Sequence, residues 1–192
     1  RVAVDTTGGY DNSVVRNTIF RRNRGSGVDI MSLYNSEADM ESPENHGILI
    51  DNCQFIDQRN GIVITTNDPH GYLTPENALA YAPHDIEIKD CVFGRTDDVS
   101  EDNTVKYPTK MGEKMRMLHL KGGHAIRYHN ARFFGEDIMV VKFRNLGGTR
   151  HLSKEVGDLL NFDVSGTVAG PAEPSKAGDR SIPFTHGPQA QD

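Results

Sequence analysis

The sequence predicts an all-β chain that forms a right-handed parallel β-helix, a solenoid of stacked coils. Three observations support this prediction: a short repeated segment, an apolar pattern of period two inside each copy, and turn-forming residues after each patterned stretch. An internal repeat of roughly 20 to 50 residues usually indicates a solenoid, because one repeat cannot bury its apolar face alone and must stack on the next.

Four copies of the repeated segment follow one another at intervals of 35 to 40 residues, at 13–20, 48–55, 86–93 and 126–133. Alternate positions are mostly apolar, as at Ile48 and Ile50, which is the period of a strand with one buried face. Each copy continues with Asn or Asp, then a small residue, and then Phe two places further on. The polar residues are Asn17, Asn52, Asp90 and Asn130, and the aromatic ones are Phe20, Phe55, Phe93 and Phe133.

The polar position of the repeat predicts a sharp corner. Asn and Asp tolerate left-handed backbone and bond to nearby backbone groups, and stacked coils would align them in a ladder. The Phe residues would then form an aromatic column inside the coil. Cys53 and Cys91 share the small-residue position one coil apart. Neighbouring parallel strands lie about 4.8 Å apart, so stacked buried thiols and a disulfide both remain open.

A further strand follows in each repeat, at 28–30, 62–64, 118–120 and 141–143. Gly27 and Gly61 precede two of these strands, as further corners would require. The order strand, Asn corner, strand, Gly corner, strand is typical of a parallel β-helix. The alternatives are a leucine-rich repeat and a β-sandwich with evenly spaced strands. A leucine-rich repeat needs a Leu-x-x-Leu-x-Leu frame, which is missing.

On these motifs, residues 1–164 resemble the pectate-lyase-like superfamily of right-handed parallel β-helix proteins. The chain opens at 1–5 with what we interpret as a strand of an earlier coil. We therefore expect it to be the C-terminal part of a longer β-helix, with a missing N-terminal region. Gly, Pro, Ala and Ser dominate residues 165–192, which predicts a C-terminal tail that buries little surface, either flexible or laid as an extended strip along the last coil.

Long loops leave the predicted coils at 32–46, 65–84 and 94–115, where they would wall a groove. The second loop contains Tyr72, whose ring could stack on a sugar. The third loop carries carboxylates that could hold calcium as a cofactor, namely Asp97, Asp98, Glu101 and Asp102. It lacks the spacing of a calcium loop, so a plain acidic surface loop is the alternative.

Alternation along the strands predicts which side chains face outward. The first strands present Arg16, Asp51, Lys89 and His129 on successive coils, a row of mixed charge that we interpret as a structural ladder. The later strands present a different row, Asp29, Val63, His119 and Lys142, flanked by Met31, Thr65, Lys121 and Arg144. Two adjacent coils would therefore place four basic side chains together.

The basic side chains concentrate in one band of an acidic protein. Residues 114–151 contain eight Lys or Arg and two acids, although the whole chain has a net charge of −6. This band predicts an anionic partner of local extent, such as an acidic polysaccharide. A solvated face that protects a sheet edge is the alternative. Nucleic acid is not the expected partner, because the chain is acidic overall and lacks aromatic residues interleaved with basic ones.

The resemblance implies a chemistry for this band. Polysaccharide lyases of the superfamily neutralise a uronate carboxylate and remove the proton at C5 with a Lys, Arg or His, and neutralisation stabilises the enolate-like intermediate. On this basis His119 or Lys121 is the expected base, since neighbouring cations lower the pKa of a Lys or His toward neutrality. Lys142 and Arg144 are the expected carboxylate clamp.

Other residues are candidates for substrate binding. Asp29 lies in the predicted outward row, and Tyr72 lies in the second loop. Asp68-Pro69-His70 is similar to the Asp-Pro-His tripeptide of alginate C5-epimerases, although Asn67 and Gly71 depart from the longer epimerase motif. Asp-Pro is also ordinary turn chemistry. The strands offer no obvious carboxylate pair for glycoside hydrolysis, which needs two acids flanking the bond.

The alternative function is non-catalytic: a β-helical adhesin, tail-spike or surface structural protein that binds glycans. Fold analogy cannot choose between an enzyme and such a rod. Both interpretations imply an extracellular, periplasmic or virion-surface location. No long apolar run is present, so no membrane span is expected, and a homo-oligomer is left open.

Overall fold

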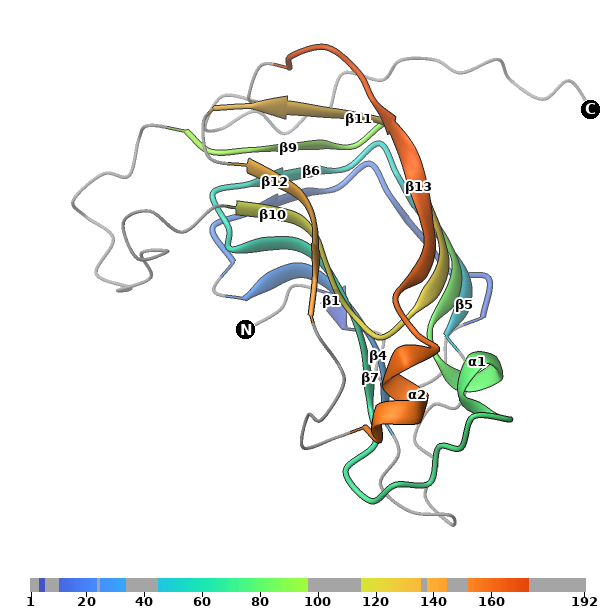
Figure 1. The fold of residues 1–192 in the computed structure, drawn as a ribbon. Helices are drawn as coiled ribbons and strands as arrows, with labels where there is room; N and C mark the ends of the chain where they lie inside the picture. The colour runs from blue at the N-terminus through green and yellow to red at the C-terminus, as the bar shows by residue number, and fades with distance from the viewer. Residues whose placement is uncertain are drawn as a thin grey trace, which may run out of the picture.

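The computed structural model is a parallel β-solenoid of about 3 turns with almost no helix (Figure 1). It describes residues 4–5, 11–23, 25–33, 45–96, 115–135, 138–144 and 152–172. Figure 1 looks roughly along the stack of coils, and the strands occupy three sides of each coil. The predicted fold class is confirmed. Each coil contributes three parallel strands, whereas a leucine-rich repeat contributes one strand per repeat and a β-sandwich is built from antiparallel sheets.

Each side of the coil is a set of parallel strands, which we name sheets A, B and C. Sheet A contains β1 (Val4–Asp5), β4 (Ser26–Leu33), β7 (Asn60–Asn67), β10 (Met115–Lys121) and β12 (Ile138–Phe143). Sheet B contains β2 (Val14–Arg16), β5 (His46–Asp51), β8 (His84–Lys89), the first half of β11 (His124–Phe134) and β13 (Phe162–Val168). Sheet C contains β3 (Ile19–Arg21), β6 (Gln54–Ile56), β9 (Val92–Gly94) and the second half of β11.

Two short helices stand at the corner where sheets A and B meet, α1 (Ala78–Tyr81) and α2 (Lys154–Asp158) (Figure 1). Ser153 caps α2, because its side chain accepts a hydrogen bond from the Val156 N–H. Among the described residues no helix is long and apolar enough to span a membrane.

The predicted corners between sheets B and C are confirmed. Asn17, Asn52, Asp90 and Asn130 all adopt left-handed backbone, with φ of 54°, 49°, 52° and 55°. Asn52 Nδ2 donates to Asn17 Oδ1 at 2.9 Å, and Asn130 Nδ2 donates to Asp90 Oδ1 at 2.6 Å. The ladder therefore turns the backbone and also joins successive coils.

The predicted aromatic column is confirmed as well. Phe20 and Phe55 stack at a centroid distance of 4.9 Å, Phe55 and Phe93 at 4.8 Å, and Phe93 and Phe133 at 6.0 Å. The last pair is tilted by 32°, and the Phe133 ring is only partly buried. The column thus packs most tightly between the inner coils.

Gly27 and Gly61 do not serve as the corners that the sequence predicted. Both lie inside strands, β4 and β7, and neither has positive φ. A Cβ on Gly27 would lie 2.5 Å from the Phe55 ring, and one on Gly61 would lie 2.6 Å from the Phe93 ring. Glycine is needed because each Phe ring packs directly against the backbone.

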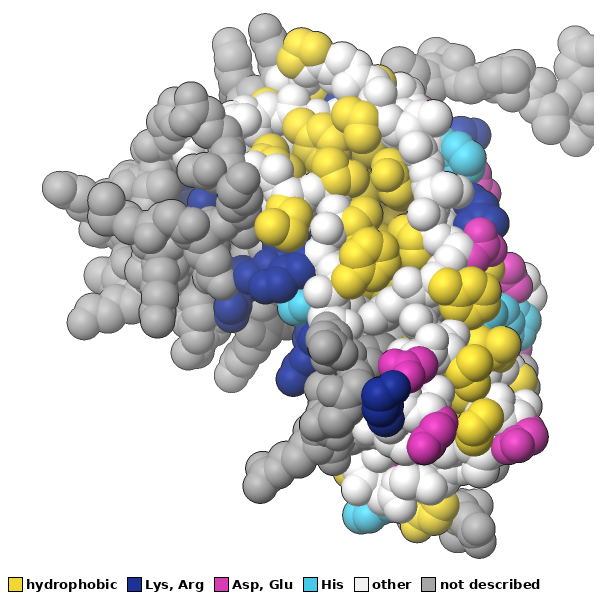
Figure 2. Space-filling model, in the orientation of Figure 1, with side chains coloured by type: hydrophobic (Ala, Val, Ile, Leu, Met, Phe, Trp, Pro, Cys, Tyr) yellow, Lys and Arg dark blue, Asp and Glu magenta, His cyan; other side chains and the backbone are white. Residues whose placement is uncertain are grey.

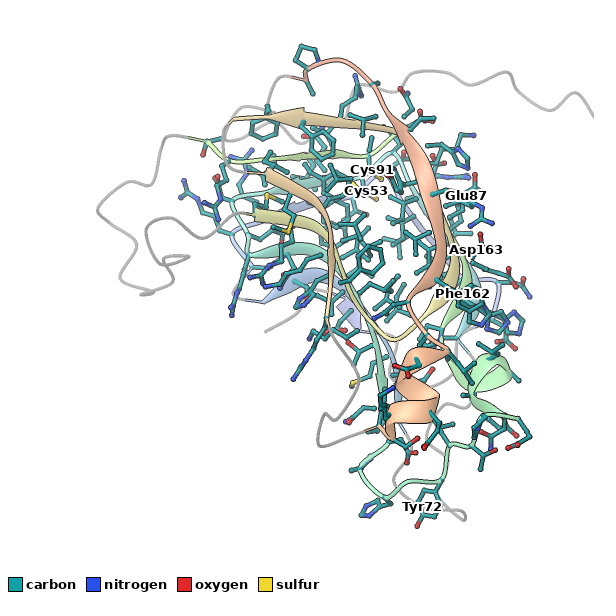
Figure 3. All side chains as sticks on the ribbon, in the orientation of Figure 1. Cys53, Tyr72, Glu87, Cys91, Phe162 and Asp163 are labelled. Atoms are coloured by element: carbon teal, nitrogen blue, oxygen red, sulfur yellow. The ribbon has the colours of Figure 1, made fainter. Side chains whose placement is uncertain are left out.

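The two cysteines occupy the interior of the coil. Cys53 and Cys91 are free and fully buried, and Figure 3 shows both pointing inward. Cys91 Sγ donates to the Lys89 carbonyl at 3.2 Å, and burial raises the pKa of this thiol. The stacked-thiol alternative is the one that the structure shows.

The ends of the described chain continue the stacking. β1 pairs with β4, so Val4 and Asp5, within the segment 1–5 that was predicted to be a strand of an earlier coil, lie in sheet A. β13 pairs with β11 up to Val168, and the Ala172 N–H then donates to the Phe133 carbonyl at 3.0 Å. Residues 165–172, predicted to belong to the tail, therefore follow the last coil. Residues 173–192, and most of the loops predicted at 32–46 and 94–115, lie outside the described residues.

Candidate functional site

The outer face of sheet A carries the predicted row in the predicted register. Asp29 pairs with Val63, Val63 with His119, and His119 with Lys142. The flanking row is aligned in the same way, since Met31 pairs with Thr65 and Thr65 with Lys121. The Arg144 N–H donates to the Leu120 carbonyl at 2.9 Å, which extends the pairing past the end of β12. Adjacent coils therefore bring together His119, Lys121, Lys142 and Arg144.

Two further arginines act on this group from the starts of the neighbouring strands. Arg116 opens β10 and is 6% exposed, and its Nη1 donates to Asn60 Oδ1 at 3.2 Å. Arg59 precedes β7 and is exposed. Both contribute positive charge at Lys121. Figure 2 shows Lys and Arg side chains gathered along the outside of sheet A. We name Arg59, Arg116, His119, Lys121, Lys142 and Arg144 the cationic cluster.

The cluster changes the proton affinity of its half-buried members. Burial, together with the charges of Lys121, Arg116, Lys142 and Arg144, lowers the pKa of His119 to about 3. Burial also lowers the pKa of Lys121, with help from Arg144. His119 is therefore an uncharged imidazole at neutral pH, and Lys121 is an amine that loses its proton more readily than an exposed lysine.

Asp29 lies on the same face, two strands away from His119. Burial lowers the pKa of Lys121, and the Asp29 carboxylate opposes this effect by raising it. The side chain is partly exposed, so it lies beside the cluster rather than beneath it. Its charge therefore favours the protonated form of Lys121.

The other three predicted binding residues lie on the loop that follows β7. The Asp68 carboxylate accepts three backbone hydrogen bonds, from Gly71 and Tyr72 at 2.9 Å and from Leu73 at 2.7 Å. These bonds, and a side chain that is only 4% exposed, show that Asp68 organises its own loop. Its predicted contact with substrate stays a prediction.

His70 and Tyr72, the other two predicted residues of this loop, also contact residues of the protein itself. The rings of His70 and Tyr72 contact each other at a centroid distance of 5.9 Å. Tyr72 also packs against a small apolar cluster that contains Leu73 and Val156 of α2. Figure 3 shows Tyr72 beyond the two helices, apart from the strands of sheet A. The structure therefore separates this loop from the cationic cluster.

Calcium binding by the acidic loop is not tested. Asp97, Asp98, Glu101 and Asp102 lie outside the described residues. Within the described ranges, no group of three or more His, Cys, Asp or Glu side chains could hold a metal ion.

Sequence reasoning missed a column of histidines at the edge of sheet B. His46, His84, His124 and Phe162 stack at successive centroid distances of 5.2, 5.1 and 5.2 Å. A ring nitrogen of His84 lies 2.9 Å from the Ala82 carbonyl, and one of His124 lies 2.8 Å from the Leu79 carbonyl, so the column ties the α1 segment to the coil. The signal was present, because each histidine stands two places before the Ile of its repeat.

The outer face of sheet B contains a shallow hollow lined by Asp85, Ile86, Glu87, Ala125, Arg127 and His129. The charges here are paired. Both Asp163 carboxylate oxygens accept from Arg127 Nη2 at 2.8 Å, and His129 Nε2 lies 3.8 Å from Glu87 Oε1. Figure 3 shows Glu87, Phe162 and Asp163 together on this side. A ligand would have to compete with these internal pairs, so this face is the weaker candidate.

The cationic cluster is therefore the candidate functional site. Its basic side chains repel one another, and burial and this repulsion lower the pKa of His119 and Lys121, a perturbation that clusters at functional sites. It offers an anion several N–H donors and one uncharged imidazole. Comparison of the chain with protein-family models, with curated proteins and with solved structures found no match. The assignment of function therefore rests on the fold and on the geometry of the cationic cluster.

Proposed function

We propose that the outer face of sheet A binds an acidic, uronate-containing polysaccharide and cleaves or epimerises it after removing the proton at C5. This is the chemistry of the pectate-lyase-like superfamily that the repeat resembles. The observation that supports it is the cationic cluster itself: half-buried basic groups from adjacent coils, aligned by strand pairing. A carboxylate ligand would relieve the repulsion between these groups.

The chemistry assigns distinct roles within the cluster. Arg144 and Lys142 bind the uronate carboxylate and stabilise the negative charge that develops when C5 loses its proton. Lys121, in its neutral form, is the base that accepts this proton. In cleavage, the C5 electron pair forms a double bond to C4 as the C4–O bond breaks, and the departing oxygen takes a proton from a solvent water. In epimerisation, a solvent water returns a proton to the opposite face of C5, and Lys121 then releases its proton to the solvent.

Lys121 is a better base than His119 on this reasoning. Efficient proton transfer requires a base whose pKa lies near the working pH. The pKa of His119, about 3, is too low for this, whereas burial only lowers that of Lys121 from its ordinary value of 10.5. His119 then serves as a hydrogen-bonding neighbour of the substrate. The proposal includes a location outside the cytoplasm, where such polysaccharides are found.

The test is incubation with polygalacturonate, alginate and chondroitin, with and without calcium, while absorbance at ~235 nm reports unsaturated products of proton abstraction. Epimerisation forms no such product and is followed by exchange of the C5 proton in deuterated water. Lys121→Met is expected to remove activity and to weaken binding by about ten- to a hundredfold, the loss of one charged hydrogen bond. Lys89→Met, on the face of sheet B, is the matched control and should change neither.

The outcomes separate the two functional classes. Binding of an acidic glycan without cleavage or exchange would favour the non-catalytic adhesin or spike. No binding to any acidic glycan would overturn the proposal. Equal loss of binding in Lys121→Met and Lys89→Met would show that net charge matters and the cluster does not.

A further inference from the structure

His119 is the only imidazole of the cationic cluster, and it is uncharged at neutral pH in the free protein. Strand pairing places it directly beside Lys142 on one side and Val63 on the other. Lys121 lies two residues along the same strand, and Arg144 lies beside Lys121. An uncharged imidazole therefore lies among basic side chains from two adjacent coils.

We propose that an acidic polysaccharide binds to the outer face of sheet A together with one proton, which His119 takes up from the solvent. This inference rests on the proposed function and names how that same site responds to pH. The step forms one N–H bond on the imidazole and consumes one solvent proton, and no other bond changes.

The reason is electrostatic. The charged groups around His119 are Arg116 and Lys121 on its own strand, Lys142 on β12 and Arg144 after β12. The other neighbouring strand, β7, places the uncharged Val63 beside it, and Asp29 lies one strand further, on β4. In the free protein the basic groups repel a further positive charge. A bound carboxylate cancels part of that repulsion and lies close enough to attract an imidazolium.

The energetic linkage runs in both directions. If the glycan raises the proton affinity of His119, then a lower pH must raise the affinity for the glycan. The pKa of His119 in the free protein, about 3, leaves the ring unprotonated at pH 5. If the complex returns this pKa toward its ordinary value of about 6.5, binding near pH 5 takes up as much as about one proton per site.

The experiment is calorimetric titration of the full chain with polygalacturonate at about pH 5 in buffers of different ionisation enthalpy, which gives the number of protons bound. Wild type is expected to take up protons, and its affinity should fall by up to about tenfold per unit as the pH rises from about 5 to 7. His119→Gln should bind without uptake and with a flat pH profile. His129→Gln, on sheet B, is the control and should behave as wild type.

A second measurement covers the case in which His119→Gln does not fold. The imidazole resonance of His119 in wild-type protein, followed by NMR with and without polygalacturonate, should titrate at a higher pH in the complex.

Failure of this inference differs from failure of the proposed function. Binding without proton uptake, uptake retained in His119→Gln, or an unshifted His119 resonance would overturn the inference and leave glycan binding intact. Absence of binding by any acidic glycan would overturn both.

Discussion

Sheets A and B are built by the same stacking of coils, yet their outer faces arrange charge in opposite ways. On sheet B, Arg16 Nε lies 2.8 Å from Asp51 Oδ2 on the next coil, and the face continues with opposite charges side by side. On sheet A, strand pairing sets Lys142 beside His119, and Lys121 lies two residues further along. Figure 2 shows the contrast, with mixed charges along one edge and Lys and Arg gathered on the other.

The difference teaches that a parallel solenoid can carry paired charges on one outer face and like charges on another. Equivalent residues of successive coils lie about 4.8 Å apart on any sheet, so each outer row is a line of closely spaced side chains. Where the sign alternates, side chains on neighbouring coils form ion pairs that add a little stability. Where the sign repeats, as at Lys121 and Arg144, neighbouring side chains repel each other, and the proposed anionic ligand would relieve this repulsion.

The largest effect is expected from removing the interior that both faces share. Phe93→Ala deletes a fully buried ring from the middle of the aromatic column, between Phe55 and Phe133. The free energy of unfolding should fall by about 3 to 5 kcal/mol, and glycan binding should be lost with the register. Denaturant unfolding measures the change, and exposed Val14→Ala is the control. A small loss, under about 1 kcal/mol, would mean that the column does not hold the coils in register.

The next largest effect is expected from a substitution that gives the face of sheet A a charge pair like those on sheet B. Thr65 pairs with Lys121 on the neighbouring coil, so Thr65→Glu places a carboxylate beside the ammonium group. Stability should rise by up to about 1 kcal/mol, while affinity for polygalacturonate falls about tenfold or more. Thr65→Gln, of equal size without charge, should retain binding. If the glutamine variant binds as weakly as the glutamate variant, the loss is steric.

The pH dependence of stability sharpens the comparison further. The pKa of His119 is about 3 in the folded protein and about 6.5 in the unfolded chain. The unfolded state therefore binds more protons between these values, and this residue costs stability as the pH falls through that window. Wild type should lose more thermal stability than His119→Gln between about pH 7 and pH 4. Parallel curves for the two proteins would contradict the low pKa.

The smallest effect is expected on sheet B. Arg16→Ala removes the 2.8 Å ion pair with Asp51, in which the arginine side chain is 52% exposed. Such exposed pairs contribute about 0.2 to 1 kcal/mol, so the melting temperature should change little and glycan binding should not change. A loss of binding comparable to that of Lys121→Met would show that both faces contact the ligand.

The repeat predicted much of this architecture because its chemistry is local. An Asn or Asp that must adopt positive φ, and a Phe two places after a small residue, are visible in one copy, and four copies fix the register. The outward row that contains Asp29, His119 and Lys142 followed from that register together with the alternation of a strand.

The repeat could not predict other features, because they depend on contacts between separate segments. Gly27 was interpreted as a corner, since a sequence cannot show that the Phe55 ring of the next coil packs on its backbone. The loop with Asp68 and Tyr72 was grouped with the cationic residues, but its direction away from sheet A depends on packing against α2. The histidine column was missed although its members share one repeat position, because the sequence does not show that their rings stack or that two of them contact carbonyls of the α1 segment.

The sequence by itself determined the solenoid, the Asn and Asp corners and the membership of each outward row, since these follow from periodicity and from the backbone preferences of Asn and Asp. The tertiary structure decided which row is balanced and which is not. It did so because the energy of a charge depends on its burial and on its neighbours across coils. Those distances exist only once successive turns of chain lie on one another.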